Sequence, residues 1–481
     1  MKAPELLSPA GTLNNLRYAF AYGADAIYAG QPRYSLRVRN NDFTLENLAT
    51  GIHEAHARGK LFYLASNVIP HNRKVDTYLA DIAPVIDLKP DALIMADPGL
   101  ILLVREKWPQ MPIHLSVQAN TVNYAAVKFW QSLGIPRVIL SRELSLDEIA
   151  DIRQRCPDME LEVFVHGALC IAYSGRCLLS GYFNHRDPNQ GACTNACRWD
   201  YKMNAGQEDL SGDIHKIDFK ALKWHAFDES IDTIEAMNQP ELSACGDLPR
   251  HPLADNVYLI EEASRPGELM PIMEDEHGTY IMNSKDLRAI EHVQRLTQIG
   301  VDSLKIEGRT KSHYYVARTA QVYRRAIDDA VAGRPFDPTL LGALDSLASR
   351  GYTDGFYQRH HSAEHQNYLE GASKNNQAQF VGEITGYDPA SGMAEIDVKN
   401  RFAVGDELEL ILPQGNQRFL LTCMMGLKGN PLQVAPGSGH RVRISVPTGQ
   451  LAMGLLARIL APGGRDRIGV GQISRAQPYL A

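Results

Sequence analysis

Several features that would assign this chain quickly are missing from its 481 residues. It has no run of about 18 apolar residues, which argues against a membrane-spanning helix. Its first residues lack the apolar core of a signal peptide, so we expect a cytoplasmic protein with no membrane partner. Positive charge is not in excess, because 49 Lys and Arg face 56 Asp and Glu and the net charge is −7. This balance argues against nonspecific nucleic-acid binding over the whole surface but leaves room for a local basic face.

Three sequence motifs of large enzyme classes are absent as well. No G-x-G-x-x-G follows the first predicted strand, which weakens a dinucleotide-binding fold. No H-E-x-x-H occurs, and the nearest stretch, H-E-A-H at 53–56, is one residue short of the helical spacing for two zinc ligands. No G-x-S-x-G nucleophile turn is present. The sequence therefore disfavours the zinc peptidases and serine hydrolases that depend on these motifs.

Cysteine is scarce but concentrated. Of the 7 cysteines, Cys170, Cys177, Cys193 and Cys197 lie in one stretch with the spacing C-x6-C-x15-C-x3-C. Such a cluster in a cytosolic chain indicates metal binding rather than disulfides. Thiolates select zinc or iron–sulfur clusters, and zinc ribbons favour C-x2-C or C-x4-C pairs, so this spacing favours an iron–sulfur cluster. Zinc and a set of buried free thiols are the alternatives. Cys245 is a second candidate for the ligand position of Cys197.

Short apolar runs alternate with amphipathic stretches over the first two-thirds of the chain. Between the runs, apolar residues recur at three- and four-residue steps, which is the helix period. Runs that are apolar throughout are typical of parallel strands covered by helices. Eight such strands have the size of a TIM-type (β/α)8 barrel, with an open doubly wound sheet as the alternative. The predicted strands are 5–9, 26–29, 61–66, 92–96, 113–118, 138–141, 161–165 and 303–306.

The eighth predicted strand comes long after the seventh. We therefore predict a barrel domain over 1–335 that carries a cysteine-rich insertion, about 170–280, after strand seven. Within this region, 201–256 is polar and predicted to be irregular. The stretch 284–299 is predicted to be a helix with Ser284 as its N-cap.

The last part of the chain has a different pattern. Residues 336–376 include a Gly-, His-, Tyr- and Asn-rich stretch with little periodicity, which indicates a linker. From 377 to 481, apolar and polar residues alternate between Gly, Pro, Asn and Asp turns. This alternation predicts a small antiparallel β-barrel domain.

The run E-V-F-V-H-G-A-L-C-I-A-Y-S-G-R-C at 162–177 resembles the signature of the collagenase-like peptidase family. L-S-P-A-G at 7–11, G-A-D-A-I-Y-A-G at 23–30, L-S-V-Q-A-N at 115–120 and S-L-K-I-E-G-R-T-K-S at 303–312 also fit that family. The resemblance covers nearly the whole chain. It implies the predicted barrel with its C-terminal β domain.

The resemblance also implies a function that the cysteines alone do not. Relatives of this kind hydroxylate the wobble uridine in the anticodon of tRNA to 5-hydroxyuridine, without oxygen and with prephenate as the source of the hydroxyl group. The implied cofactor is a 4Fe–4S cluster on Cys170, Cys177, Cys193 and Cys197. The role of that cluster, whether structural, Lewis-acidic or redox, stays open. A peptidase, as the family name implies, and a noncatalytic RNA-binding protein with a structural zinc are the alternative functions.

Residues that follow barrel strands face the C-terminal mouth, where TIM-barrel active sites lie. We take His166, Gln118 and Glu307 as the candidate catalytic residues, since an imidazole exchanges protons near neutral pH and an amide suits a planar base edge. Prephenate is a dicarboxylate, and arginine binds carboxylates through paired hydrogen bonds. The candidate substrate-binding residues are Arg37, Arg39, Arg142, Arg309, Asn120 and Lys311.

The stretch G-R-T-K-S at 308–312 precedes a predicted helix. Backbone N–H groups and the helix dipole there favour an RNA phosphate or a substrate carboxylate, with simple N-capping by Thr310 or Ser312 as the alternative. Tyrosines are expected to stack on a splayed base. The expected tRNA contacts are the basic features 33–39, 305–311, Arg318 with 324–325, and 401–441, and the aromatic residues Tyr34, Tyr314 and Tyr315.

Overall fold

The computed structural model describes most of the barrel and of the C-terminal domain, and parts of the insertion. It divides into two compact units, Met1–Leu344 with Ala348–Lys374, and Asp345–Leu347 with Asn375–Ala481. No described helix is long and apolar enough to cross a membrane. The described residues are 1–31, 34–35, 42–68, 70, 72–168, 172–173, 176–177, 201–208, 214–216, 257–262, 269–275, 278–281, 286–347, 352–358, 378–447 and 449–460.

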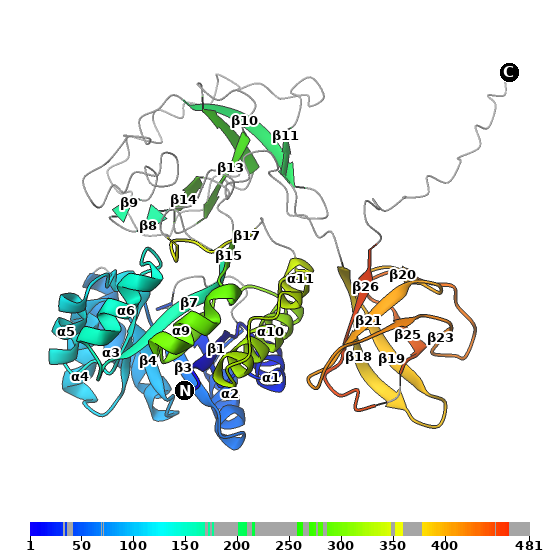
Figure 1. Cartoon of the computed structure of the whole chain (residues 1–481), viewed down its shortest axis with the longest axis horizontal. Coiled ribbons are helices and arrows are strands. Elements are labelled where there is room, and N and C mark those ends of the chain that lie inside the picture. The colour runs from blue at the N-terminus through cyan, green and yellow to red at the C-terminus, as the bar shows by residue number, and fades with distance from the viewer. Residues whose placement is uncertain are drawn as a thin grey trace. The chain divides into compact units, whose positions relative to one another are not determined.

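Eight parallel strands form a closed barrel, which confirms the predicted TIM-type fold (Figure 1). Each strand pairs with the next, and the last pairs with both the seventh and the first, which closes the ring. The strands are β1 (Glu5–Pro9), β2 (Ala26–Gly30), β3 (Leu61–Ala65), β4 (Ala92–Met95), β5 (Ile113–Leu115), β6 (Arg137–Ile139), β7 (Glu160–Ala168) and β16 (Ser303–Ile306).

Helices between the strands cover the outside of the barrel. Side-chain oxygens of Ser, Thr, Asp and Asn cap most of their N-termini, and Ser145 forms a full capping box with Glu148. Gly23, Gly59 and Gly134 follow helices with positive φ, a conformation that favours glycine at helix C-termini. The helices are α1 (Leu13–Ala21), α2 (Leu45–Ala57), α3 (Asn72–Asp87), α4 (Pro98–Lys107), α5 (Tyr124–Ser132), α6 (Leu146–Arg155), α9 (Val293–Ile299) and α10 (His313–Val331).

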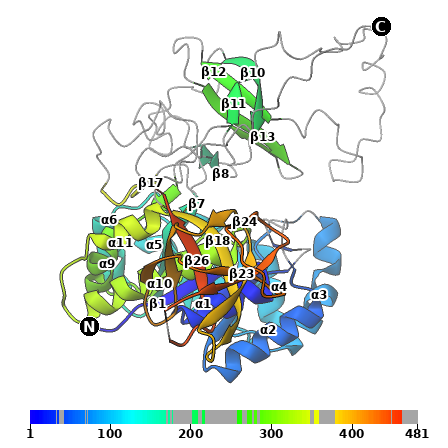
Figure 2. The same ribbon diagram turned by 90° about the vertical axis from the view of Figure 1, so that its right-hand side faces the viewer.

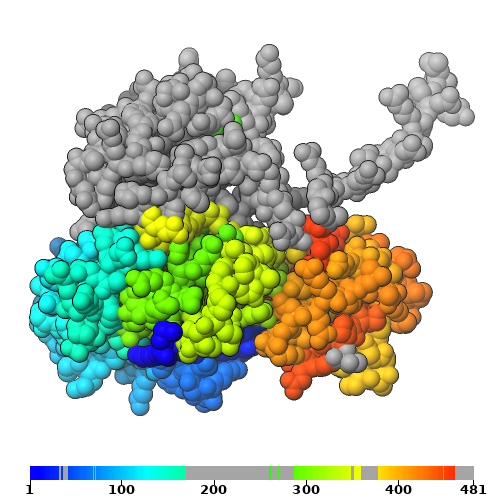
Figure 3. Space-filling model, in the orientation of Figure 1, coloured from blue at the N-terminus to red at the C-terminus, as the bar shows by residue number. Residues whose placement is uncertain are grey.

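The two ends of the barrel sequence meet on its surface. In Figure 3 the N-terminal segment, in dark blue, lies against the green and yellow-green surface of the segment around 300. Lys2 Nζ lies 3.1 Å from Asp302 Oδ1, and the same carboxylate pairs with Arg153. The ion pair between Lys2 and Asp302 joins residues near the two ends of the barrel sequence, beside the pairing of β1 with β16 that closes the barrel.

Two of the predicted elements around the barrel are wrong in part. The predicted strand 113–118 ends early, because a 3-10 helix, η1 (Val117–Ala119), follows β5. The predicted helix 284–299 is a strand, β15 (Asp286–Arg288), then a 3-10 helix, η5 (Ile290–His292), and only then α9. Strand β15 pairs antiparallel with the end of β7, so a contact distant in sequence overrides the local helical pattern.

The insertion contains more regular structure than the sequence predicts. Residues 201–256 are predicted to be irregular, yet part of this range supplies two strands of a five-stranded antiparallel sheet (Figure 2). Its strand order is β11 (Ile214–Lys216), β10 (Tyr201–Glu208), β12 (Val257–Glu262), β13 (Leu269–Asp275) and β14 (Gly278–Ile281). A two-stranded pair, β8 (Ala172–Tyr173) with β9 (Arg176–Cys177), lies in the cysteine stretch.

The segment 336–376, predicted to be a linker, also contributes to the barrel unit. It holds helix α11 (Thr339–Asp345) and strand β17 (Tyr352–Thr353), which pairs with β15. The hydroxyl of Tyr357 donates to the carbonyl of Phe164 on β7 at 2.6 Å, and His292 lies 3.0 Å from Asp354. This segment therefore packs against the C-terminal end of β7.

The C-terminal unit is antiparallel, as predicted. Its seven-stranded sheet has a buried core that includes Val381, Ile396, Phe402, Leu408 and Ile444. In β25, buried residues alternate with exposed ones, which is the pattern the sequence shows. The sheet order is β22 (Gln417–Leu420), β21 (Glu407–Ile411), β26 (Leu455–Ile459), β18 (Ala378–Asp388), β19 (Met393–Val398), β25 (Arg441–Ser445) and β23 (Met424–Gly426), with β20 (Phe402–Ala403) and β24 (Val434–Ala435) as a separate pair.

Candidate active site at the barrel mouth

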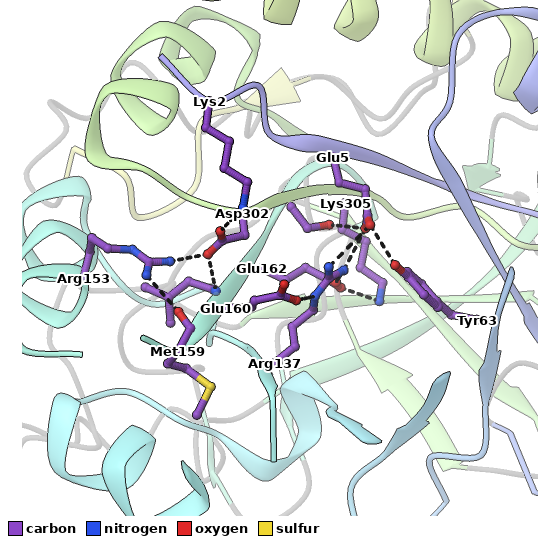
Figure 4. Close-up of polar contacts among 12 residues, drawn as sticks. Lys2, Glu5, Tyr63, Arg137, Arg153, Met159, Glu160, Glu162, Asp302 and Lys305 are labelled. Atoms are coloured by element: carbon purple, nitrogen blue, oxygen red, sulfur yellow. Dashed lines mark hydrogen bonds and ion pairs between the residues drawn. The ribbon is translucent and has the colours of Figure 1, made fainter. Parts of the chain in front are cut away.

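Charged side chains fill the barrel interior below the mouth (Figure 4). Arg137 Nη1 lies 2.7 Å from Glu5 Oε1 and 3.4 Å from Glu162 Oε2. Lys305 Nζ lies 2.8 Å from the other oxygen of Glu162, and the Tyr63 hydroxyl donates to Glu5 at 2.7 Å. Each of these charges has an opposite partner, which offsets part of the cost of burying it.

Lys305 connects this network to the aromatic layer above it. Its ammonium lies 4.4 Å from the ring centre of Tyr28 and 5.4 Å from that of Phe164. Burial lowers the pKa of Lys305, while the carboxylate of Glu162 opposes that shift. Tyr28 in turn donates its hydroxyl to the carbonyl of Ile306 at 3.0 Å and lies 3.3 Å from Glu307 Oε2. The position of Glu307 is therefore linked to the barrel interior.

The loop between β16 and α10 is the centre of the mouth. The Glu307 N–H donates to the carbonyl of His166 at 2.8 Å, and the Tyr315 hydroxyl donates to the carbonyl of Glu307 at 2.8 Å. The Glu307 carboxylate lies 3.6 Å from Arg142 Nη2. Contacts from β2, β7 and α10 thus hold this one residue in place.

Three glycines make room for this loop. A Cβ on Gly30 would lie 2.0 Å from Arg309 Nη1, and one on Gly167 would lie 2.4 Å from the carbonyl oxygen of Glu307. A Cβ on Gly308 would lie 2.6 Å from the Tyr315 ring. Gly167 and Gly308 also have φ of 104° and 147°, which side-chain-bearing residues rarely adopt. Glycines from three separate sequence motifs therefore allow the close packing of the loop between β16 and α10.

The two predicted arginines at the mouth are held from different sides. Arg142 donates through Nη1 to the carbonyl of Ala168 at 2.9 Å, and its guanidinium lies 3.8 Å from the ring centre of Phe164. Arg309 donates to the hydroxyl of Ser35 at 3.2 Å and is buried. These contacts fix the Arg142 guanidinium beside Glu307 and the Arg309 guanidinium beside Ser35.

His166 is buried and uncharged. The Tyr323 hydroxyl donates its one proton to the carbonyl of Val165 at 2.7 Å, so its 3.3 Å contact with His166 Nδ1 requires the proton on Nδ1. Nε2 then carries the lone pair, and it has no hydrogen-bond partner among the described residues. Burial, with the nearby cations Arg288 and Lys311, lowers the pKa of His166 to about 3.

Gln118 and Asn120 form a second polar group on the rim, after β5. Gln118 Oε1 accepts from Asn67 Nδ2 and from Ser116 Oγ, each at 2.7 Å. Asn120 adopts a left-handed conformation with φ of 51° and donates weakly to the carbonyl of Gln118 at 3.5 Å. Asn67 follows β3, so the Gln118 amide reaches across the end of β4 to meet it.

The N-terminus of α10 has the geometry of a capped helix. Ser312 is the N-cap, and its hydroxyl accepts from the Tyr315 N–H at 3.3 Å. Lys311 is half-buried, with Nζ 5.6 Å from the Tyr315 ring centre. The N-capping alternative for Ser312 is thus confirmed, while an anion at this terminus stays a prediction.

The predicted cluster ligands cannot be placed. Cys170, Cys193 and Cys197, and the alternative ligand Cys245, lie outside the described residues, as do Arg37 and Arg39. Cys177 belongs to β9, of which only the backbone is described. In the described part of the chain, no three His, Cys, Asp or Glu side chains are grouped so that they could hold a metal ion. A metal site on the cysteine stretch therefore stays a prediction.

Comparison with known proteins assigns the family. The model of peptidase family U32 matches residues 11–367, and that of the family's C-terminal domain matches 376–458. The chain belongs to peptidase family U32. It is 60% identical over 448 residues to "tRNA hydroxylation protein P" of Escherichia coli (strain K12), covering 93% of this chain and 94% of that protein. Its identity to the protein of the same name from Haemophilus influenzae is 59%, covering 92% and 93%.

Relatives of this chain carry names that refer to different activities. The chain is also 26% identical to a protein named "Collagenase" from Porphyromonas gingivalis, covering 85% of this chain and 86% of that one. The H-E-A-H stretch does not resemble a peptidase zinc site here, because Glu54 pairs with Arg17 at 2.6 Å and His56 with Asp91 at 3.0 Å on the barrel exterior. These ion pairs account for the stretch without a metal.

Some residues expected to contact tRNA have structural roles instead. Tyr34 is fully buried, and Tyr314 and Tyr315 are 6% exposed, so none of them presents a free ring face to a base. Arg318 is also buried, while Arg324 pairs with Asp25 at 3.0 Å. The helical pattern of α10 explains these positions as core and surface ion pairs. Base stacking by these three tyrosines and tRNA contact by Arg318 are therefore wrong predictions, whereas tRNA contact by the other basic residues stays a prediction.

Proposed function

We propose that this protein hydroxylates uridine in tRNA. The observation that carries the proposal is the 60% identity to a protein named for tRNA hydroxylation, spread over nearly the full length of both chains. Similarity over that span includes the barrel, the insertion and the C-terminal domain, so nearly all of that relative has a counterpart here. The polar mouth around Glu307 provides a site at the end of the barrel where chemistry takes place.

We further propose that the product is 5-hydroxyuridine at the wobble position of the anticodon, and that prephenate supplies the hydroxyl group without oxygen. Two guanidinium groups, of the half-buried Arg142 and the buried Arg309, support a carboxylate ligand at the mouth. In the absence of that ligand, Glu307 partly neutralises Arg142 at 3.6 Å. A dicarboxylate substrate would accept hydrogen bonds from these guanidinium groups.

His166 suits the role of acceptor in this site. Its lone pair on Nε2 is buried and unpartnered among described groups, and the lowered pKa keeps the ring neutral at physiological pH. A neutral imidazole at this position accepts a hydrogen bond from a bound substrate, whereas a pKa of about 3 makes it a poor proton acceptor near neutral pH. Gln118 and Glu307 complete the proposed catalytic residues, the first as a donor on the rim and the second as the carboxylate that holds Arg142.

Four thiolates fit a 4Fe–4S cluster, and we propose Cys170, Cys177, Cys193 and Cys197 as its ligands, with Cys245 as the alternative to Cys197. Such a cluster would either hold the local structure or supply iron as a Lewis acid or an electron carrier. The stretch begins immediately after β7, whose C-terminal end carries His166. That order along the chain supports a cluster near the mouth rather than at the opposite end of the barrel.

Nucleoside analysis of tRNA tests the proposal. A strain that lacks this gene and any parallel enzyme should contain no 5-hydroxyuridine, and the intact gene should restore it. Cys170→Ala and Cys193→Ala should remove both the brown colour of anaerobically purified protein and the product. Cys423→Ala is the matched control, because Cys423 is a free cysteine in the C-terminal domain. Undiminished 5-hydroxyuridine in the deletion strain would refute the proposed function.

A further inference from the structure

The Gln118 side chain is held in one orientation by two buried or half-buried donors. Its Oε1 accepts from Asn67 Nδ2 and Ser116 Oγ at 2.7 Å each, which uses both lone pairs of that oxygen. Ser116 is 2% exposed, so its hydroxyl cannot turn to water instead. The amide group therefore keeps its oxygen toward the wall and its NH2 group on the other side.

The NH2 group of Gln118 has no acceptor among the described residues, where its oxygen has two. Gln118 is half-buried and belongs to η1, at the C-terminal end of β5. Asn67 reaches it from the end of β3, which lies two strands away. The two donor hydrogens are thus offered on the rim of the mouth.

The turn that carries Gln118 is itself constrained. It is a 3-10 helix of three residues, and it ends at Asn120 in the left-handed conformation. Non-glycine residues adopt this conformation at a cost, and such positions gather at functional sites. The local backbone therefore favours one fixed position of the Gln118 NH2 group.

We propose that Gln118 recognises the O4 atom of the target uracil and so selects uridine over cytidine. This proposal rests on the proposed hydroxylation of tRNA uridine. Uracil presents a carbonyl oxygen at this position, where cytosine presents an amino group that is itself a donor. The NH2 group of Gln118 would face the amino group of cytosine, so two hydrogen-bond donors would meet with no acceptor between them. This arrangement disfavours binding of cytidine. Asn67 and Ser116 are the positioning residues, because they act only by orienting the Gln118 amide.

The test compares two anticodon stem–loop RNAs that differ only by U or C at the wobble position. Binding of each is measured without oxygen for the wild type and for Gln118→Glu, which replaces the NH2 group by an acceptor oxygen of nearly the same shape. We expect the preference for the U-containing RNA to fall by about tenfold to a hundredfold in Gln118→Glu. Gln118→Met, which removes the donors without adding an acceptor, should reduce the preference to a smaller extent.

Gln131→Glu is the matched control, since Gln131 is exposed on α5 and makes the same change of charge away from the mouth. It should leave the preference unchanged. Ser116→Ala should lower the preference with little effect on the affinity for the C-containing RNA, an effect that loss of folding would not produce.

Two results would overturn the proposal. One is an unchanged U-to-C ratio in both Gln118 variants, with both folded as judged by thermal melting. The other is a change confined to the apparent affinity for prephenate, which would assign the amide to the co-substrate carboxylate. A wild-type protein that binds with a U preference but forms no 5-hydroxyuridine would contradict the proposed function and leave the role of Gln118 standing.

Discussion

Gly30→Ala is the perturbation that tests the geometry of the mouth most sharply. Gly30 ends β2 with an ordinary φ, so alanine causes no backbone strain. Its Cβ, however, would lie 2.0 Å from Arg309 Nη1 and 2.4 Å from Ser35 Oγ, where ordinary contact begins at 3.4 Å. The guanidinium must therefore move by more than about 1 Å, and a displacement of that size at a reacting site costs about a hundredfold in rate.

The assay is prephenate-dependent formation of 5-hydroxyuridine by anaerobically purified protein, measured as kcat/KM. We expect Gly30→Ala to lower it by about a hundredfold, chiefly through KM for prephenate, and to lower the free energy of unfolding by about 1–3 kcal/mol. Gly386→Ala is the control, because its Cβ would meet only Glu395 Cβ at 3.8 Å. A Gly30→Ala enzyme that keeps kcat/KM within twofold would refute the assignment of Arg309 to substrate binding.

Other predictions concern the buried charges. Lys305→Met leaves the fully buried Glu162 with Arg137 as its remaining cation. In denaturant titrations this change should lower the free energy of unfolding by about 3–5 kcal/mol. Lys2→Met, at an exposed ion pair, is the control and should change it by less than about 1 kcal/mol. Burial also lowers the pKa of His114 far below its usual value, so the unfolded chain binds a proton below about pH 6.5 that the folded chain does not. Stability should therefore fall as the pH drops below that value, by up to about 1.4 kcal/mol per pH unit for this residue, and His114→Gln should remove that part of the slope; an unchanged slope would contradict a buried neutral His114.

The barrel could be predicted because its strands are covered on both faces. A strand of that kind is apolar throughout, and β1 and β16 begin and end at the predicted residues. Strand β15 could not be predicted in the same way, since its pairing with β7 depends on residues more than a hundred positions earlier. Its local pattern suits a helix equally well, and only the long-range contact decides.

The charged residues inside the barrel could have been predicted from their alternation in one strand. In the first half of β7, the charged residues Glu160 and Glu162 alternate with the apolar residues Leu161 and Val163. In a barrel, alternate residues face the interior, and acidic residues there require buried cations. Arg137 on β6 supplies one of them. A charged residue at an alternate strand position thus indicates the interior network.

The site was predictable in its parts but not in its contacts. Topology alone places His166, Arg142 and Glu307 at strand ends on one face of the barrel. The hydrogen bond from Arg309 to Ser35 joins residues 274 positions apart, and no local pattern indicates it. No local pattern indicates either that Gly30 leaves space for the Arg309 side chain. Spacing in sequence therefore gives the candidate residues, and tertiary structure decides which of them meet.

Transfer of a labelled hydroxyl group tests the central claim most directly. Prephenate carrying heavy oxygen in its hydroxyl group is incubated with the iron-loaded protein and unmodified tRNA without oxygen, and the tRNA nucleosides are analysed by mass spectrometry. The proposed function predicts 5-hydroxyuridine that carries the label, formed by the wild type and lost in Cys170→Ala. Unlabelled 5-hydroxyuridine, or none from protein that contains its iron, would contradict it.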